Sequence, residues 1–481
     1  MRKALFGKRA LAGILISSLV TALLTGCGYD SLDEYLKQLG IRDPMEYDDI
    51  WEEASITASS DILAQLDAYE GQDKSTEAAS FDAQAPSEEE AVYAAEESDI
   101  KEDLEFTSDY LSINESSMDK EVLKARTDIG LTADGIALLK EKQKGNYAFE
   151  KLTESGKTLY VEMLTIMENL AEDVSVSTLK SDAIELIFDY IMMDHPEIFY
   201  VSGFRYTNYT LDDVVTRVSF SGEYTCDAAE VASRKTRIND AVNRCLAGAP
   251  SSEDDYYVIK YVYEYLIDHV EYDTQAPDNQ NICSVFLNGR SVCNGYAKAA
   301  QYLLQKLGIE CSFVTGTVNT KNGRQERHAW NLVLCNDAYY YMDVTWGDAS
   351  YQTVSGESAD SSKLPTVNYD YLNVTTQELG RHHELSDIIR MPICSSMTDN
   401  YYVREDEYFT SPELTLVGEL FDRRYADGSK NVTIKCATDE VYRKLFYDLI
   451  TDKKVFEFLQ GDSAQVSYTT FEDTRTIMFW L

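Results

Sequence analysis

Three residues in the second half of the chain have side chains that could together carry out acyl transfer through a thiol. They are Cys293, His328 and Asp343, separated by 328 − 293 = 35 and 343 − 328 = 15 positions. A thiol enzyme needs a nucleophile, an imidazole that exchanges protons and a carboxylate that orients the imidazole. The residue types and their order therefore predict a cysteine-dependent acyl-transfer site.

The sequence around the cysteine predicts a helix that begins at Cys293. Apolar side chains then recur at the spacing of one helical face, at Ala297, Ala300, Leu303, Leu304 and Leu307. Gly308 follows at the place of a C-terminal cap. At a helix N-terminus the backbone N–H groups lack partners and the dipole favours negative charge. This position favours the thiolate of Cys293 and offers donors for an oxyanion.

The histidine and the aspartate are expected on neighbouring strands of an antiparallel sheet. The segment IECSFVTGTV predicts one strand, and the pair Asn322-Gly323 marks a turn. HAWNLVLC and AYYYMDVTW predict two more strands. His328 would open the first of these two strands, and Asp343 would end the second.

The short connection between the last two strands predicts which residues pair across them. If Asn336-Asp337 forms the hairpin turn, residue 334 pairs with 339 and residue 330 with 343. His328 and Asp343 then lie on the same face as diagonal neighbours, within reach of an imidazole–carboxylate contact. A slip of one residue would place them on opposite faces of the sheet.

The segments GRSVCNGYAKAAQYLLQKLGI, RHAWNLV and YYMDVTWGD resemble the transglutaminase-like superfamily, a papain-related group of thiol enzymes. The resemblance covers roughly 250–385 and includes the apolar stretch Ser284-Val285-Phe286-Leu287 before the cysteine. It implies that Cys293 is the nucleophile, His328 the base and Asp343 the orienting acid. The implied fold is α+β, a papain/transglutaminase-like core with the cysteine helix packed on an antiparallel sheet. HPEIFYVSGFRYT (195–207) further resembles the flank of a bacterial, surface-located branch.

Several residues near these motifs have structural alternatives. Trp330 and Trp346 are expected in packing, although either could line an acyl channel, and Asp348 is expected to hold a loop. An aspartate before a turn, as at Asp343, is often a cap or turn residue. The second oxyanion donor stays open between Tyr272 and Gln280.

No cofactor or metal site is expected. The sequence has neither His-Glu-x-x-His nor Cys-x-x-Cys, and Lys151 stands where a phosphate loop ending at Thr158 would need glycine. The adjacent pair His382-His383 could bind a metal but is expected to be solvated on a polar loop. Eight cysteines follow Cys27; with Cys293 free, seven remain, so complete pairing into disulfides is impossible.

The first residues predict a lipoprotein leader. MRKALFGKR is a positive segment, and ALAGILISSLVTALL is an apolar segment too short for a comfortable membrane span. Leu24-Thr25-Gly26-Cys27 then matches a lipoprotein processing site, with cleavage before Cys27. The mature chain would be anchored by lipid on Cys27 to the outer face of the cell membrane.

The segment that follows the leader is strongly acidic. Residues 28–106 contain 24 acidic and 4 basic residues, a balance of 4 − 24 = −20, which is half of the whole-chain charge of −40. Such a segment buries too little apolar surface to offset its ordering cost, and its charges repel one another. It predicts a solvated spacer, with a partner-binding acidic tail as the minority interpretation. The overall charge excludes nucleic acid as a partner, because phosphate binding needs a basic face.

The remaining chain is long enough for two or three domains. The predicted organisation is a signal peptide at 1–26, an acidic, mostly disordered spacer at 27–119, an N-terminal α+β domain at 120–248, a transglutaminase-like catalytic core at 249–385 and a C-terminal α+β appendage at 386–481. In the appendage LTLVGEL, NVTIKCA, DEVYRKLFYDLIT and YTTFEDTRTIMFWL predict the order strand, strand, helix, strand.

The favoured function is hydrolysis of peptide or side-chain amides by a cysteine peptidase or amidase, with cell-wall peptides among the expected substrates. If a lysine amine rather than water resolved the thioester, the same site would be a protein-cross-linking transglutaminase. A non-catalytic surface binding module and a structural surface protein are the alternatives from other classes. An intact Cys-His-Asp set argues against both.

Overall fold

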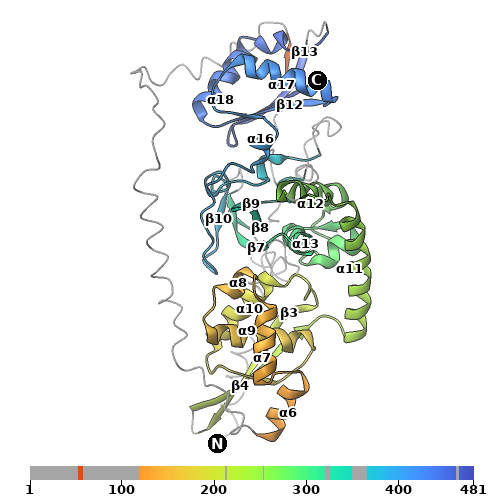
Figure 1. Ribbon diagram of the computed structural model, residues 1–481, viewed down its shortest axis with the longest axis vertical. Coiled ribbons are helices and arrows are strands. Elements are labelled where there is room, and N and C mark those ends of the chain that lie inside the picture. The colour runs from red at the N-terminus through yellow and green to blue at the C-terminus, as the bar shows by residue number, and fades with distance from the viewer. Residues whose placement is uncertain are drawn as a thin grey trace, which may run out of the picture. The chain divides into compact units, whose positions relative to one another are not determined.

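The computed structural model describes residues 53–57, 119–211, 214–252, 254–319, 325–348, 366–461 and 465–481. Contacts divide the chain into two compact units, of which the first ends at Asp406 (Figure 1). The second comprises Glu407–Leu481 together with strand β1 (Glu53–Thr57). The predicted leader, the lipid site at Cys27, most of the predicted acidic spacer and the turn at Asn322-Gly323 lie outside the described residues and stay predictions.

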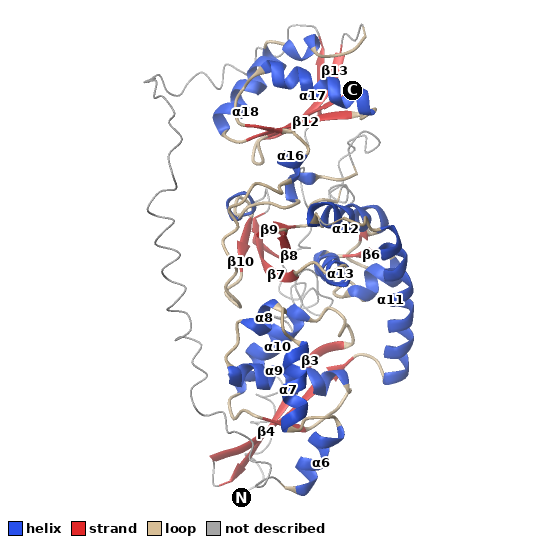
Figure 2. Cartoon of the chain, viewed as in Figure 1, coloured by secondary structure: helices blue, strands red, loops and turns tan. Residues whose placement is uncertain are grey.

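The N-terminal part of the first unit consists of helices around a small antiparallel sheet of order β2-β4-β3 (Figure 2). Threonine or aspartate side chains accept backbone N–H groups at the starts of α7, α9 and α11, which satisfies donors that a helix otherwise leaves open. The elements are α6 (Lys120–Asp128), α7 (Ala133–Lys142), α8 (Tyr147–Glu150), α9 (Glu154–Glu168), β2 (Val174–Val176), α10 (Ser181–Asp194), β3 (Val201–Leu211), β4 (Val214–Tyr224) and α11 (Ala228–Gly248).

The C-terminal part of the first unit carries the predicted motifs on a four-stranded antiparallel sheet of order β10-β7-β8-β9. Helix α13 packs against β7 and β8, and α12 packs against α13. The elements are α12 (Asp255–His269), β5 (Glu271–Tyr272), β6 (Arg290–Ser291), α13 (Cys293–Lys306), β7 (Cys311–Asn319), β8 (Gln325–Cys335), β9 (Ala338–Met342), α15 (Thr376–Leu379), β10 (His383–Leu385) and α16 (Tyr401–Arg404). This arrangement confirms the predicted α+β core with its cysteine-bearing helix.

The predicted hairpin register is confirmed. Cys335 pairs with Ala338, and the ladder continues to Asn331 opposite Met342. Asn336 has a φ of 53°, the left-handed conformation that a two-residue hairpin turn requires and that asparagine tolerates. Strand β8 begins at Gln325, three residues before His328, so the prediction that His328 opens the strand was wrong by that amount.

The predicted domain boundary at 248/249 falls between α11 and α12, inside the first compact unit. One hydrogen bond across this boundary runs from Gln301 Nε2 to the carbonyl oxygen of Met193, at 2.7 Å. The N-terminal helices therefore pack directly on the part of the chain that carries the cysteine helix. Among the described residues, no helix is both long and apolar enough to cross a membrane.

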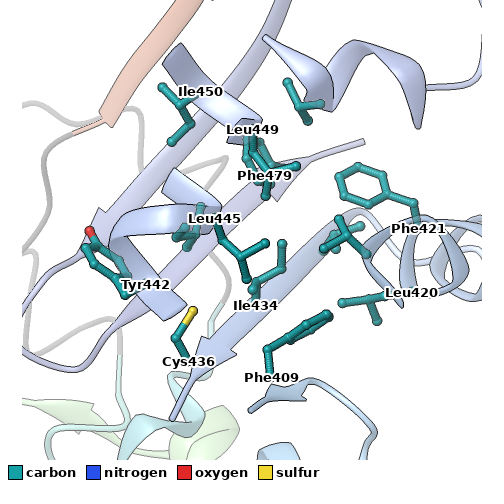
Figure 3. Close-up of a cluster of buried hydrophobic side chains, with 14 of the residues drawn as sticks. Phe409, Leu420, Phe421, Ile434, Cys436, Tyr442, Leu445, Leu449, Ile450 and Phe479 are labelled. Atoms are coloured by element: carbon teal, nitrogen blue, oxygen red, sulfur yellow. The ribbon is translucent and has the colours of Figure 1, made fainter. Parts of the chain in front are cut away.

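The second unit has its own core between helices and a five-stranded sheet of order β1-β13-β14-β12-β11 (Figure 3). LTLVGEL, predicted as a strand, begins helix α17 (Leu414–Asp427), whose buried Val417, Leu420 and Phe421 recur at helical spacing. YTTFEDTRTIMFWL forms most of a hairpin rather than one strand. The remaining elements are β11 (Tyr408–Phe409), β12 (Asn431–Cys436), α18 (Asp439–Phe446), β13 (Gln465–Phe471) and β14 (Thr476–Trp480).

Candidate active site

Cys293 is the first residue of α13, as the sequence predicts, and its side chain is fully buried. The preceding residue, Val292, has no side-chain oxygen, so the N-cap makes no side-chain hydrogen bond to the first turn. A valine at this position forgoes about 1 kcal/mol of helix stabilisation that a serine or aspartate cap would supply. The uncapped first turn keeps its N–H groups available for negative charge beside the sulfur.

Gly295 allows the segment before the helix to pack tightly on its first turn. A Cβ atom at this position would lie 1.9 Å from Ser291 Oγ and 2.9 Å from Ser284 Oγ. The two serine hydroxyls are 2.6 Å apart, and Ser291 Oγ also donates to the carbonyl oxygen of Asn279 at 3.1 Å. The absence of a side chain at Gly295 therefore lets residues 279–291 pack against the first turn of α13.

Asn331 connects the cysteine helix to the histidine strand. Its side-chain Nδ2 donates to the carbonyl oxygens of Ala297 in α13, at 2.9 Å, and of Ser312 in β7, at 3.4 Å. Asn331 is fully buried, so these bonds form in a dry interior, where an unpaired side-chain N–H group would be costly. The asparagine three residues after His328 thus fixes the distance between helix and strand.

The imidazole of His328 lies between Asp343 and Cys293. His328 Nε2 is 2.7 Å from Asp343 Oδ2, and the thiol of Cys293 is a further side-chain hydrogen-bond partner of His328. Since Nε2 faces the carboxylate, Nδ1 is the nitrogen that remains for the thiol. The structure therefore brings together all three residues that the sequence nominates, in the order sulfur, imidazole, carboxylate.

Electrostatics favour a charged imidazole beside a charged carboxylate. Burial by itself lowers the pKa of His328, but the Asp343 carboxylate and its hydrogen bond raise it to about 10, with Cys293 adding to the rise. For Asp343, burial would raise the pKa, yet the charge and hydrogen bond of His328 and the contact with His383 hold it well below its usual range. The pair is therefore an imidazolium and a carboxylate at neutral pH.

A second histidine, which sequence reasoning missed, also contacts the acid. His383 Nε2 lies 2.9 Å from Asp343 Oδ2, and the side chain is buried. The expectation that His382-His383 is solvated was wrong for His383, because β10 adds to the edge of the sheet and turns this residue inward. The local sequence offers only a histidine in a short segment that ends in leucine. Such a segment does not indicate a contact with Asp343, which is 40 positions earlier.

The two candidate oxyanion donors lie in the segments that precede the helix. Asn294, the residue after Cys293, donates from Nδ2 to Gln280 Oε1 at 2.7 Å. Gln280 Nε2 in turn donates to Asn279 Oδ1 at 3.1 Å. Tyr272 is buried in β5, opposite Ser291 of β6. The amide of Gln280 is thus tied to the first turn of α13.

The remaining nominated residues have packing and positioning contacts. Trp330 and Trp346 are buried, and Asp348 accepts a hydrogen bond from the hydroxyl of Tyr296 at 2.6 Å. None of the eight cysteines among the described residues is in a disulfide bond. Seven are buried, and Cys226 is partly exposed.

Comparisons with known proteins bear on this region. Residues 243–344 match the model of the transglutaminase-like superfamily. The human kyphoscoliosis peptidase (Homo sapiens) is 22% identical over 228 residues, which are 44% of this chain and 33% of the relative. The chain therefore spans about a third of the curated relative that it matches.

Two solved structures also align with part of this chain, at low similarity. A TGase aligns at 12% identity with a TM-score of 0.22, covering 33% of this chain and 50% of that chain. A candidate cysteine protease from Cytophaga hutchinsonii aligns at 11% identity with a TM-score of 0.20, covering 29% of this chain and 61% of that chain. With the family match, the sequence motifs and the α+β core in agreement, residues 243–344 are a transglutaminase-like domain, related to cysteine peptidases and transglutaminases.

Proposed function

We propose that the transglutaminase-like domain is a cysteine-dependent enzyme that hydrolyses peptide or side-chain amides. The observation that carries the proposal is the contact of one buried imidazole, that of His328, with both the Cys293 thiol and the Asp343 carboxylate. A binding module has no need for this combination, and the peptidase name of the human relative points the same way.

The proposed reaction proceeds through a thioester. The Cys293 thiolate attacks the carbonyl carbon of the amide, and an oxyanion forms at the N-terminus of α13. The His328 imidazolium protonates the nitrogen of the leaving amine, and the C–N bond breaks. His328, now neutral, takes a proton from water, whose oxygen attacks the thioester and releases the acid and the Cys293 sulfur. Asp343 keeps the imidazole oriented in both steps.

Hydrolysis and cross-linking differ only in what attacks the thioester. Glutamine-containing peptides should be incubated with the purified protein, with and without a primary amine. The proposal expects hydrolysis in both samples, seen as ammonia from side-chain amides or as shorter peptides from peptide bonds, and no covalent incorporation of the amine, with Cys293→Ala protein as the blank. Incorporation of the amine at a rate comparable to ammonia release would instead assign the transglutaminase reaction.

We infer that Gln280 supplies the second oxyanion donor, because its amide contacts the residue next to Cys293. Gln280→Ala should lower kcat for amide hydrolysis about 10²-fold with little change in KM, since the donor acts on charge that develops in the transition state. Tyr272→Phe removes the hydroxyl of the other candidate donor and keeps its ring. This change should alter kcat by less than about threefold. A larger loss in the Tyr272 variant than in the Gln280 variant would reverse the assignment.

A further inference from the structure

The two histidines that contact Asp343 come from strands on either side of β7. His328 pairs with Gly316, and His383 pairs with Val318. Positions 316 and 318 are two residues apart on one strand, so both histidines belong to the same face of the sheet. Gly316, on the strand between them, leaves room for β10 and for the Trp330 ring. A Cβ atom there would lie 2.0 Å from the carbonyl oxygen of Glu384 and 2.6 Å from the Trp330 ring.

The carboxylate of Asp343 has four donors. Oδ1 accepts the backbone N–H groups of Thr345, at 3.0 Å, and Trp346, at 3.2 Å. Oδ2 accepts from His328 at 2.7 Å and from His383 at 2.9 Å. An ionised carboxylate only accepts hydrogen bonds and offers about four lone-pair sites. Every site is therefore filled, and both histidines must carry a proton on Nε2.

The two imidazoles nevertheless differ in charge. Burial lowers the pKa of His383, and although Asp343 opposes this effect, the charge on His328 adds to it, so the net shift is downward. His383 Nδ1 is buried and has no hydrogen-bond partner among the described residues. His383 is therefore a neutral imidazole that only donates from Nε2, whereas His328 carries the positive charge and contacts the thiol.

Aromatic rings surround the second histidine. The His383 ring centroid lies 4.9 Å from that of Trp330, 4.9 Å from that of Trp346 and 6.0 Å from that of Tyr371. These rings restrict rotation of the imidazole and keep water from Asp343. In such a dry site an unfilled lone pair on Oδ2 costs more than it would in water, so the carboxylate would turn to find another donor.

We propose that His383 is a positioning residue that holds the Asp343 carboxylate in place while His328 gains and loses its proton. The proposal rests on the proposed function, because it assigns a fourth member to the same set of residues. When His328 gives its proton to the leaving amine, its attraction to Asp343 weakens. The hydrogen bond from His383 and the two backbone donors then keep the carboxylate facing His328 for the next step.

A divalent cation is the competing interpretation of the same three side chains. Two imidazoles and a carboxylate whose ligand atoms lie within 4.8 Å of one another match the ligand types that zinc uses. Both Nε2 atoms, however, lie at hydrogen-bond distance from the same carboxylate oxygen, Asp343 Oδ2. A cation bound by both histidines would have to lie where the two Nε2 atoms point. Asp343 Oδ2 already occupies that position.

Two matched variants separate hydrogen bonding from packing at this position. His383→Phe keeps an aromatic ring among Trp330, Trp346 and Tyr371 but has no donor, whereas His383→Gln keeps an N–H donor and loses the ring. The measurements are kcat and KM for amide hydrolysis, the rate of Cys293 alkylation by iodoacetamide, and the melting temperature of the full chain.

The phenylalanine variant should lose about tenfold or more in kcat and in alkylation rate with KM nearly unchanged, and the glutamine variant should recover most of the loss. A packing role predicts the reverse order, with the glutamine variant worse and less stable, and would overturn the proposal. The proposal would also be overturned if metal analysis of the wild-type protein found one zinc ion per chain and if hydrolysis required that zinc. If wild-type Cys293 is not selectively alkylated at all, the proposed function fails instead.

Discussion

Cys293→Ala protein should show no amide hydrolysis above a level about 10⁴-fold below wild type, and His328→Ala should approach the same level. The reason is that the two residues act as one unit: the sulfur attacks, and the imidazole supplies the proton without which the amine does not leave. Initial rates on a peptide amide substrate measure the loss of hydrolysis. The rate of iodoacetamide modification at each cysteine, followed by peptide mass spectrometry, measures how reactive the Cys293 thiol is.

The other cysteines provide the internal control. Cys226 is the partly exposed thiol, whereas Cys293 is fully buried, so accessibility alone would favour modification of Cys226. Activation by the helix N-terminus and His328 should reverse that order, and His328→Ala should restore it. Cys226→Ala should leave hydrolysis unchanged. Equal, slow modification of Cys226 and Cys293 would mean that the thiol is not activated and would favour a binding module.

Asp343→Asn should lower kcat/KM about 10⁴-fold and move the alkaline limb of its pH profile downward. In wild type, Asp343 raises the pKa of His328 to about 10 although burial lowers it, so the imidazolium persists through neutral pH. The active form is then lost only as pH rises toward 10. Without the negative charge, the effect of burial is no longer opposed, and the imidazolium is lost at a lower pH.

The matched control is Asp348→Asn, a second buried acid on the same connection. Asp348 accepts a hydrogen bond from the hydroxyl of Tyr296. Its replacement should affect stability and leave the alkaline limb in place. A profile of the Asp343 variant with an unshifted alkaline limb would indicate that this limb does not report on His328.

The parts of the site that sequence predicts are those set by local rules. Helical spacing after Cys293, the glycine at 308 and the uncapped first turn are properties of neighbouring residues. The hairpin is equally local, because a two-residue turn at Asn336-Asp337 fixes every pair up to Asn331 and Met342. His328 and Asp343 therefore had to share a face once the turn was correct.

Predictions failed where a short pattern fits two structures. LTLVGEL alternates well enough for a strand, but its continuation FDRRYAD keeps the helical period, and the longer pattern forms α17. The final segment was predicted as one strand because its turn residues are few; Arg475, with a φ of 58°, ends that turn. In both places the structure depended on residues beyond the short segment from which the prediction was made.

Only the tertiary structure assigns His383 to the site. Its strand pairs with Val318, which is 383 − 318 = 65 positions earlier, and no rule of spacing links two segments so far apart. The sequence by itself nominated Cys293, His328 and Asp343 and predicted the helix and the hairpin that carry them, because each of these patterns depends on contacts within a few residues. Long-range packing decided that Gln280 contacts the residue after Cys293 and that a second imidazole shares the carboxylate, because sheet-edge pairing and burial come from the fold as a whole.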